Sequence, residues 1–268
     1  MLIIGESLNA TRKDVREAIK AQDVSFIQAL AIEQAECGAN MLDVNAAVTG
    51  RCEAEDLVWM VENVQKVVKI PLVLDSSDPD ALTAALKVHQ GRPMVNSLSA
   101  ETEKLEKLLS VVSGADCDVI VLCMDDTGIP STIEGRLAAA RLVVGELVKS
   151  GKNPSDLYID PLVMPLSVDN AAPQMTLNLF KQFHNSGSPE FLGVHTTGGL
   201  SNVSFGMPNR RLLNSHYITM AIACGMDSCI VDVRNKSLMA GIYAAEALVT
   251  VAGMRNYLKL CRKGLIET

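Results

Sequence analysis

The sequence has few aromatic residues and no excess of basic ones. Phe, Trp and Tyr make up 4% of its 268 residues, and 24 Lys and Arg are outnumbered by 31 Asp and Glu, which gives a formal net charge of −7. Binding a nucleic-acid backbone requires clustered Lys and Arg, and binding single strands requires aromatic side chains that stack on the bases. The composition therefore argues against a nucleic-acid partner.

Paired cysteines and long apolar segments are also lacking. The seven cysteines include no Cys-x-x-Cys pair, so the sequence predicts neither a disulfide framework nor a metal site, and a reducing, cytoplasmic location is expected. Residues 1–6 lack the basic and apolar regions of a signal peptide and predict a strand instead. The most apolar window, residues 238–253, contains Glu246 and is shorter than the ~20 residues of a membrane span. We expect no membrane segment there but a buried helix, which could also contact a second subunit.

What the sequence does contain is a regular alternation of short apolar runs and segments with helical spacing. The runs predict eight strands, at residues 2–4, 41–44, 72–74, 94–95, 119–123, 157–159, 191–194 and 229–231. Alternating strands and helices predict a parallel sheet, and eight such units predict a closed (β/α)8 TIM barrel. No linker divides the chain, so we expect residues 1–268 to form a single domain.

Two further patterns bear on this prediction. A doubly wound sheet would carry a G-x-G-x-x-G turn after its first strand, but Gly5 is followed by Glu6-Ser7-Leu8-Asn9. Three predicted helix ends share one pattern, in which a glycine able to adopt the left-handed conformation is followed by a polar residue and a strand. These ends are Gly38-Ala39-Asn40, Gly114-Ala115-Asp116 and Gly225-Met226-Asp227.

Polar residues follow nearly every predicted strand, at the end of a barrel where ligands bind. They are Glu6, Asn9, Asp43, Asn45, Asp75, Ser76, Asn96, Ser97, Asp160, His195, Asn202 and Asp232. Asp, Asn and Ser are also common helix N-caps, and that alternative is open for each position taken alone. Asp75 and Asn96, however, precede their helices by several residues, and Asp160 is followed by Pro161. Many acceptors and amides with few cations favour a neutral heterocycle rich in N–H donors over a phosphate.

Several runs of residues at these strand ends form a recognisable set. The chain carries Leu74-Asp75-Ser76, Val95-Asn96-Ser97, Leu157-Tyr158-Ile159-Asp160-Pro161-Leu162 and Gly199-Leu200-Ser201-Asn202-Val203-Ser204, and between them Leu42-Asp43-Val44-Asn45, Thr127-Gly128-Ile129-Pro130 and Ala223-Cys224-Gly225-Met226. In order and spacing these runs resemble the pterin-binding methyltransferases, and among them the methyltetrahydrofolate:corrinoid protein methyltransferases. The resemblance covers essentially the whole chain.

The resemblance implies a barrel that holds a pterin across its mouth. Asp75, Asn96 and Asp160 would bind the pyrimidine edge, and Asn202 would reach N5 and act as the catalytic residue. Asp43 and Asn45 would support this network, and Ser97 and Glu6 complete the set of candidate pterin-binding residues. Carboxylates can accept hydrogen bonds from the amino group and ring N–H of a pterin, while an amide can both donate and accept.

The activity that the resemblance implies is methyl transfer between N5 of tetrahydrofolate and the cobalt of a corrinoid protein, in either direction. The chain has no Asp-x-His-x-x-Gly signature of a cobalamin lower ligand, so we expect a separate protein to carry the cobalamin. Relatives are dimers, which makes a homodimer the expectation. Met207, Arg210 and Arg211 are candidate docking residues for the corrinoid protein, with ordinary surface exposure as the alternative for the arginines.

Two other functions are compatible with parts of the pattern. Dihydropteroate synthases are similar at the third, fourth and sixth strands, but their seventh strand ends in a Ser-Arg-Lys-type segment where this chain has Gly199-Leu200-Ser201-Asn202. A folate-binding subunit without turnover is the second alternative. His195, within the glycine-rich segment 186–199, is favoured as a structural histidine over a proton donor to N5.

Overall fold

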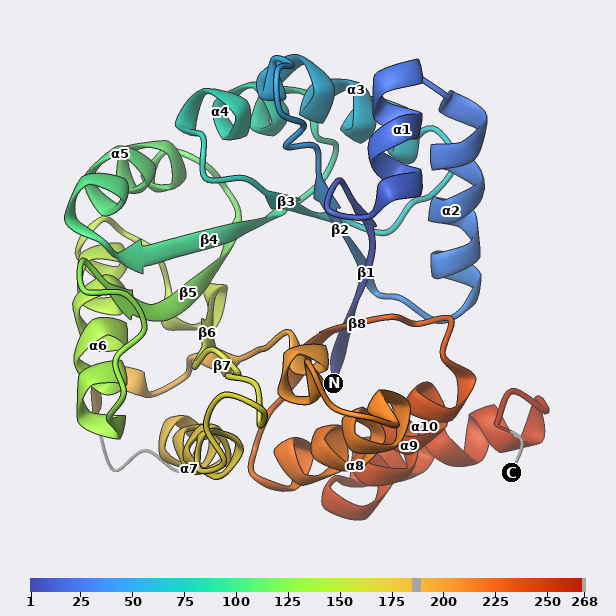
Figure 1. Cartoon of the computed structure of the whole chain (residues 1–268), viewed down its shortest axis with the longest axis vertical. Helices are drawn as coiled ribbons and strands as arrows, with labels where there is room; N and C mark the ends of the chain where they lie inside the picture. The colour runs from blue at the N-terminus through green and yellow to red at the C-terminus, as the bar shows by residue number, and fades with distance from the viewer. Residues whose placement is uncertain (185–188, 267–268) are drawn as a thin grey trace.

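The computed structural model describes residues 1–184 and 189–266, in which eight parallel strands encircle a common centre inside a ring of helices (Figure 1). The strands are β1 (Leu2–Asn9), β2 (Met41–Asn45), β3 (Leu72–Asp75), β4 (Met94–Ala100), β5 (Asp118–Asp125), β6 (Leu157–Asp160), β7 (His195–Thr196) and β8 (Ser228–Val231). Their order is β7-β6-β5-β4-β3-β2-β1-β8. Between β7 and β8 a single bridge joins Gly199 to Ile230, whose N–H donates to Gly198 O at 3.1 Å. The predicted (β/α)8 barrel is confirmed.

The helices connect successive strands and cover the outside of the barrel. They are α1 (Lys13–Ala21), α2 (Val24–Glu36), α3 (Glu53–Gln65), α4 (Pro79–Val88), α5 (Thr102–Ser113), α6 (Ile133–Lys149), α7 (Ala172–His184), α8 (Arg210–Ala223), α9 (Lys236–Val249) and α10 (Val251–Arg262), with 3-10 turns η1 (Pro154–Asp156), η2 (Pro189–Phe191) and η3 (Leu200–Ser204). Within the described residues no helix is both long and apolar enough to cross a membrane.

Alternation along the strands decides what lies inside the barrel. A small buried cluster fills the interior toward the amino ends of five strands. It consists of Ile4, Met41, Val73, Met94 and Ile120. Successive side chains of a strand point to opposite faces, so the residue two positions later also faces the interior. On β1 to β4 those residues are Glu6, Asp43, Asp75 and Asn96. The interior is therefore apolar at the amino ends of these strands and polar at their carboxyl ends.

The seventh strand was predicted in the wrong place. The apolar run 191–194 is not a strand, because Phe191 ends the 3-10 turn η2 and packs edge-on against Phe183, at 5.0 Å between ring centroids. The strand begins only at His195. Residues 186–188 of the glycine-rich segment lie outside the described part of the chain.

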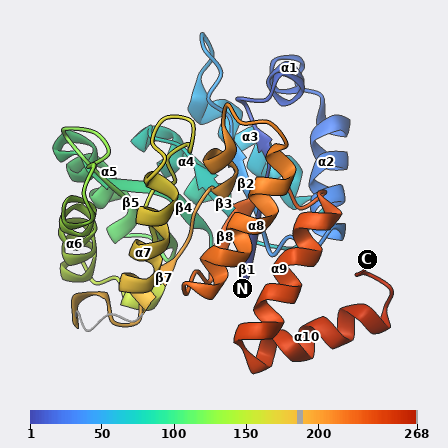
Figure 2. The same cartoon turned by 60° about the horizontal axis from the view of Figure 1, so that its bottom comes forward.

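The predicted buried helix over 238–253 is also wrong in part. The chain forms two helices there, because Thr250 adopts an extended conformation and its hydroxyl accepts a hydrogen bond from Gly253 N at 2.8 Å. Leu248 is 88% exposed, so the apolar run is not buried throughout. Figure 2 shows α10 projecting from the outer face of the barrel beyond α9.

Two of the three predicted left-handed glycines are confirmed. Gly38 and Gly225 have φ of +100° and +99°, whereas Gly114 has φ of −90° and ends its helix in the right-handed region. The shared sequence pattern therefore produces two different helix ends.

Candidate functional site

The carboxylate of Asp75 lies at the carboxyl end of β3 and accepts two amide hydrogen bonds. Asn9 and Asn45 donate their Nδ2 groups to Asp75 Oδ2 at 3.3 and 3.2 Å. Helix α4 is capped instead by Asp78, whose side chain accepts from Asp80 N. Asp75 is thus held in place by neighbouring strands and is not a helix cap.

Asp43 and Asn96 form a second pair beside it. Asn96 Nδ2 donates to Asp43 Oδ1 at 3.1 Å, and Asp43 is only 3% exposed. Asn96 lies within β4, well before α5, so it is not a helix cap either. The next residue on β4, Ser97, is half-buried. One N–H of Asn96 Nδ2 binds Asp43, so the amide oxygen can accept a hydrogen bond from a ligand and the second N–H can donate one.

Burial raises the pKa values of the acidic groups on β1 to β3. For Asp43 the pKa is raised well above its usual range, first by burial and then by the neighbouring charge of Asp75. Burial raises the pKa of Asp75 to about 6, although the hydrogen bond from Asn45 opposes the shift. Burial and the charge of Asp232 raise the pKa of Glu6 to about 7. Strongly shifted carboxylates that share one end of a barrel are typical of a functional site.

Asp160 and Asn202 lie on the other side of the barrel mouth. Asp160 ends β6 and is 7% exposed, its Oδ1 accepts a hydrogen bond from Leu162 N at 2.7 Å, and burial raises its pKa to about 6. Asn202 lies on η3 with its side chain exposed, and its Nδ2 donates to Val163 O at 2.6 Å. Residues 161–163 therefore connect the two predicted site residues.

His195 lies at the opposite end of the barrel. It pairs in the sheet with Tyr158, near the start of β6, and the two rings stack at 4.8 Å between centroids. Its Nδ1 lies 2.6 Å from Asp227 Oδ2, just before β8. His195 is therefore hydrogen-bonded, as the structural role favoured by the sequence requires, and it lies at the end of the barrel away from Asp160 and Asn202.

The comparisons with known proteins agree with this geometry. The family described as pterin binding enzyme matches residues 5–232. The chain belongs to this family. It is 38% identical over 269 residues to the methylcorrinoid:tetrahydrofolate methyltransferase of Eubacterium limosum, an alignment that covers 99% of this chain and 98% of that protein. It is 28% identical over 244 residues to methionine synthase of Mycobacterium leprae, covering 86% of this chain and 20% of that much longer protein.

Solved structures of pterin-binding enzymes share the fold. Dihydropteroate synthase from Clostridium difficile superimposes with a TM-score of 0.69 at 17% identity, covering 92% of this chain and 96% of that one. The dihydropteroate synthase of Stenotrophomonas maltophilia gives a TM-score of 0.66 at 17% identity, with 93% of each chain covered. At this identity the likeness establishes the barrel architecture alone.

The pterin-binding barrel also contains residues near the site that the sequence reading missed. Asn9 was noted only as a residue at a strand end, yet it donates to Asp75. Arg136 is not among the residues predicted from the sequence, although it is 1% exposed and binds the loop that follows Asp160. A signal was present, because Arg136 lies in helical register with buried residues of α6, namely Ala139, Ala140, Val143, Val144 and Leu147. A cation on the buried face of a helix requires partners.

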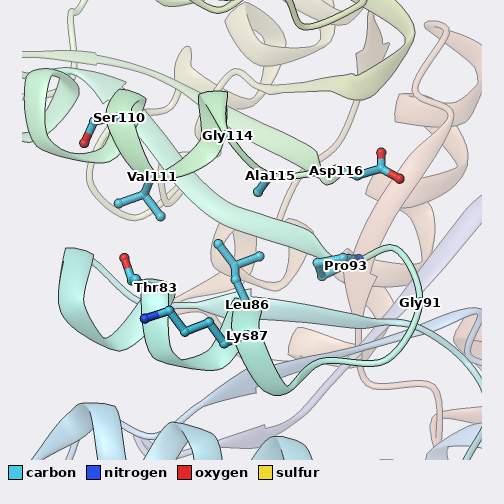
Figure 3. A pocket seen from close by; sticks show the side chains of 10 residues that line it. All are labelled: Thr83, Leu86, Lys87, Gly91, Pro93, Ser110, Val111, Gly114, Ala115 and Asp116. Atoms are coloured by element: carbon cyan, nitrogen blue, oxygen red, sulfur yellow. The ribbon is translucent and has the colours of Figure 1, made fainter.

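A cavity on the outside of the barrel lies away from the acidic and amide groups described above. It measures about 590 Å³ and lies between α4 and α5 (Figure 3), lined by Thr83, Leu86, Lys87, Gly91, Pro93, Ser110, Val111, Gly114, Ala115 and Asp116. Pro93 directly precedes β4, and Asp116 lies two residues before β5. The cavity is therefore at the amino ends of the strands. Ligands of such barrels bind at the carboxyl ends, where the acidic and amide groups described above lie.

Proposed function

We propose that the protein transfers a methyl group between N5 of tetrahydrofolate and the cobalt of a separate corrinoid protein. The observation that carries this proposal is the 38% identity, over 99% of the chain, to a protein named for that reaction. The acidic and amide groups at the barrel mouth supply a matching site. The likeness to dihydropteroate synthases is limited to the fold and gives that alternative no comparable support.

In this proposal Asp75, Asn96 and Asp160 bind the pyrimidine edge of the pterin. With pKa values of about 6, Asp75 and Asp160 are mostly ionised at neutral pH and accept hydrogen bonds from the amino and ring N–H groups. The oxygen of Asn96 accepts a further one. A ligand without those donors would leave each buried acceptor unpaired at a cost of about 1–3 kcal/mol, which gives the site its selectivity.

Asn202 would act at N5. As the bond between N5 and the methyl carbon breaks, its electron pair stays on N5, which must take up a proton or a strong hydrogen bond. The Asn202 amide cannot serve as an acid at neutral pH, but it carries two N–H groups, of which one binds Val163 O. The second is free to stabilise N5 electrostatically in the transition state. The corrinoid partner supplies cobalt(I) as the nucleophile, or its methyl group in reverse.

Asp43, Asn45, Ser97 and Glu6 would support this site. Asp43 and Asn45 hold the side chains of Asn96 and Asp75 through the hydrogen bonds described above. Either direction of transfer uses the same groups, since a catalyst accelerates both; the name of the Eubacterium limosum relative describes transfer from methylcorrinoid to tetrahydrofolate.

We also propose that the chain 1–268 works as one domain in the cytoplasm and as a homodimer. Exposed apolar side chains on the two last helices support a subunit contact there. They are Leu248, Val249, Val251, Met254 and Leu258.

The test is a spectroscopic assay of the purified protein. Mixed with methyltetrahydrofolate and cob(I)alamin, or with methylcobalamin and tetrahydrofolate, it should interconvert the cobalt(I) and methylcobalt(III) absorbance spectra. Binding of the folate should be measured in parallel by titration. A protein that binds methyltetrahydrofolate and yet produces no spectral change, with free cobalamin or with a corrinoid protein, would be a folate-binding subunit without turnover.

A further inference from the structure

The buried guanidinium of Arg136 binds three backbone carbonyls from two loops. Its Nε donates to Pro130 O at 2.9 Å in the loop between β5 and α6. Its Nη1 donates to Pro161 O at 2.5 Å and to Leu162 O at 2.6 Å in the loop between β6 and α7. One side chain of α6 therefore joins two loops at the carboxyl end of the barrel.

The loop between β6 and α7 binds the side chains of both Asp160 and Asn202. Leu162 N donates to Asp160 Oδ1, and Val163 O accepts from Asn202 Nδ2. Leu162 has φ of +62°, a left-handed conformation that is unfavourable for a residue with a side chain. Such a conformation persists only where neighbouring groups hold it. The two bonds from Arg136 to the carbonyls of residues 161 and 162 provide that constraint.

Arg136 also contributes a charge. Its hydrogen bonds go to backbone carbonyls, so no carboxylate neutralises it there. Burial raises the pKa of Asp160, whereas hydrogen bonds from the backbone of Leu162 and Gly199 and, to a smaller extent, the positive charge of Arg136 lower it. A buried cation that binds only dipoles is costly and is retained where its charge or its geometry is needed.

We infer that Arg136 is a positioning residue for methyl transfer, which fixes the loop 161–163 so that Asp160 and Asn202 are correctly placed to contact the pterin. This inference rests on the proposed function. It concerns a residue that lies behind the site and acts through the backbone of that loop.

A matched control is present at the other end of the barrel. Lys152 is 8% exposed, and its Nζ donates to Ala115 O at 2.7 Å and Cys117 O at 2.8 Å. It too is a buried cation that binds backbone carbonyls, but it lies near the amino end of β5. Substituting either cation should lower thermal stability, and only Arg136 should affect the site.

The experiment compares Arg136→Met, Arg136→Lys and Lys152→Met. We expect Arg136→Met to weaken binding of methyltetrahydrofolate by about tenfold or more and to lower kcat further, because both Asp160 and Asn202 lose their support. Loss of the charge should also shift the acid limb of folate binding, which is the fall in folate affinity as pH decreases, to higher pH. Arg136→Lys keeps the charge and loses the planar fork, so its acid limb should match that of the wild type while kcat stays reduced. Lys152→Met should leave folate binding, kcat and the acid limb unchanged.

A merely structural Arg136 would give a different pattern. If Arg136→Met and Lys152→Met lose similar melting temperature and both keep wild-type folate affinity and pH dependence, the inference is wrong. It is equally wrong if the acid limb of Arg136→Lys moves as far as that of Arg136→Met. Should Arg136→Met not fold, the comparison of kcat and folate affinity in Arg136→Lys decides. Failure of the proposed function would show separately, as wild-type protein that binds folate without methyl transfer.

Discussion

At the amino ends of the strands Arg92 lies among three carboxylates, whereas at the carboxyl ends Asp43 and Asp75 lie beside one another with amides as partners. Arg92 Nε is 2.9 Å from Asp118 Oδ1 and Nη2 is 2.8 Å from Asp156 Oδ1, and Arg92 also pairs with Asp116. The acids at the mouth are bound instead by Asn9, Asn45 and Asn96. Arg92 thus pairs opposite charges, whereas Asp43 and Asp75 have amides as partners; of the acids at the mouth, Asp232 does have a cation beside it, with Arg234 Nε 2.9 Å from its Oδ1.

The difference separates stability from function. Ion pairs between Arg92 and its partners hold the connections at the amino ends together, as does the bond between His195 and Asp227. Asp43 and Asp75 have raised pKa values, which means that burying them in ionised form costs folding free energy. Hydrogen bonds from Asn9, Asn45 and Asn96 offset part of that cost. Barrels of this class place stability at the amino ends and chemistry at the carboxyl ends.

The largest expected effect at the mouth is on the rate. Asn202→Ala should lower kcat by roughly 100-fold and change the dissociation constant for methyltetrahydrofolate by less than about threefold, because the lost N–H group acts mainly in the transition state. Stopped-flow absorbance of the corrinoid measures the first quantity and folate titration the second. Equal losses in both would contradict the role given to Asn202.

The next effect is on affinity. Asp75→Ala should weaken folate binding by about 10-fold to 100-fold, since two donors of the pterin lose a buried acceptor. The matched variant at the other end, Arg92→Ala, should lower the free energy of unfolding by about 1 kcal/mol and leave folate affinity unchanged. Isothermal titration and urea unfolding of both variants measure this contrast. A loss of folate affinity in Arg92→Ala would break it.

The acids at the mouth should also give stability a characteristic pH dependence. The pKa of Asp75 rises from 3.8 in the unfolded chain to about 6 in the folded one, so the folded state binds more protons between these values. The free energy of unfolding therefore falls as pH rises through this window, by about 1–3 kcal/mol for a shift of this size. Asp75→Asn should remove that fall and be more stable than the wild type at pH 7.5 but not at pH 4. Urea unfolding at several pH values tests this, and an unchanged slope in the variant would count against it.

The smallest effect is expected from His195 at the amino end. Its hydrogen bond to Asp227 raises its pKa above the usual 6.5, so protonation stabilises the folded state. That contribution is fully present below pH 6.5 and is lost as pH rises through the higher folded pKa. His195→Gln should therefore lower stability at pH 6 more than at pH 8.5, by a small amount because the ring is half-exposed, and should leave kcat unchanged. A decrease in kcat would return His195 to the list of candidate proton donors.

Much of the barrel could be predicted because its strands are short, apolar and evenly spaced. Seven of the eight predicted strands overlap observed ones, and the prediction at residues 191–194 failed because the apolar run there is not part of a strand. Phe191 packs against Phe183 and under Arg141. The local sequence pattern does not distinguish an apolar residue used for such packing from one in a strand. The same limit applies to residues 238–253, where one hydroxyl, that of Thr250, divides an apolar helix into two.

The positions of the site residues at strand ends followed from the sequence, but their partners did not. Alternation places Glu6, Asp43 and Asp75 inside the barrel, since each follows a core residue by two positions. That Asn9 and Asn45 share one oxygen of Asp75 depends on the stagger between neighbouring strands, which a single sequence does not reveal. The helical register of Arg136 with buried residues of α6 indicates its burial, but its partners are backbone carbonyls, which the residue types of a sequence do not identify.

The joint between β7 and β8 has a consequence for the motion of the barrel. β7 has two residues, and one bridge at Gly199 and Ile230 completes the ring, whereas β2 to β5 are held by longer ladders. Local opening requires less free energy where fewer backbone hydrogen bonds must break. Amide protons at this joint should therefore exchange with deuterated solvent earlier than those of β2 to β5. Because η3 with Asn202 begins at the next residue, the barrel can loosen beside Asn202 while the remaining strands stay closed.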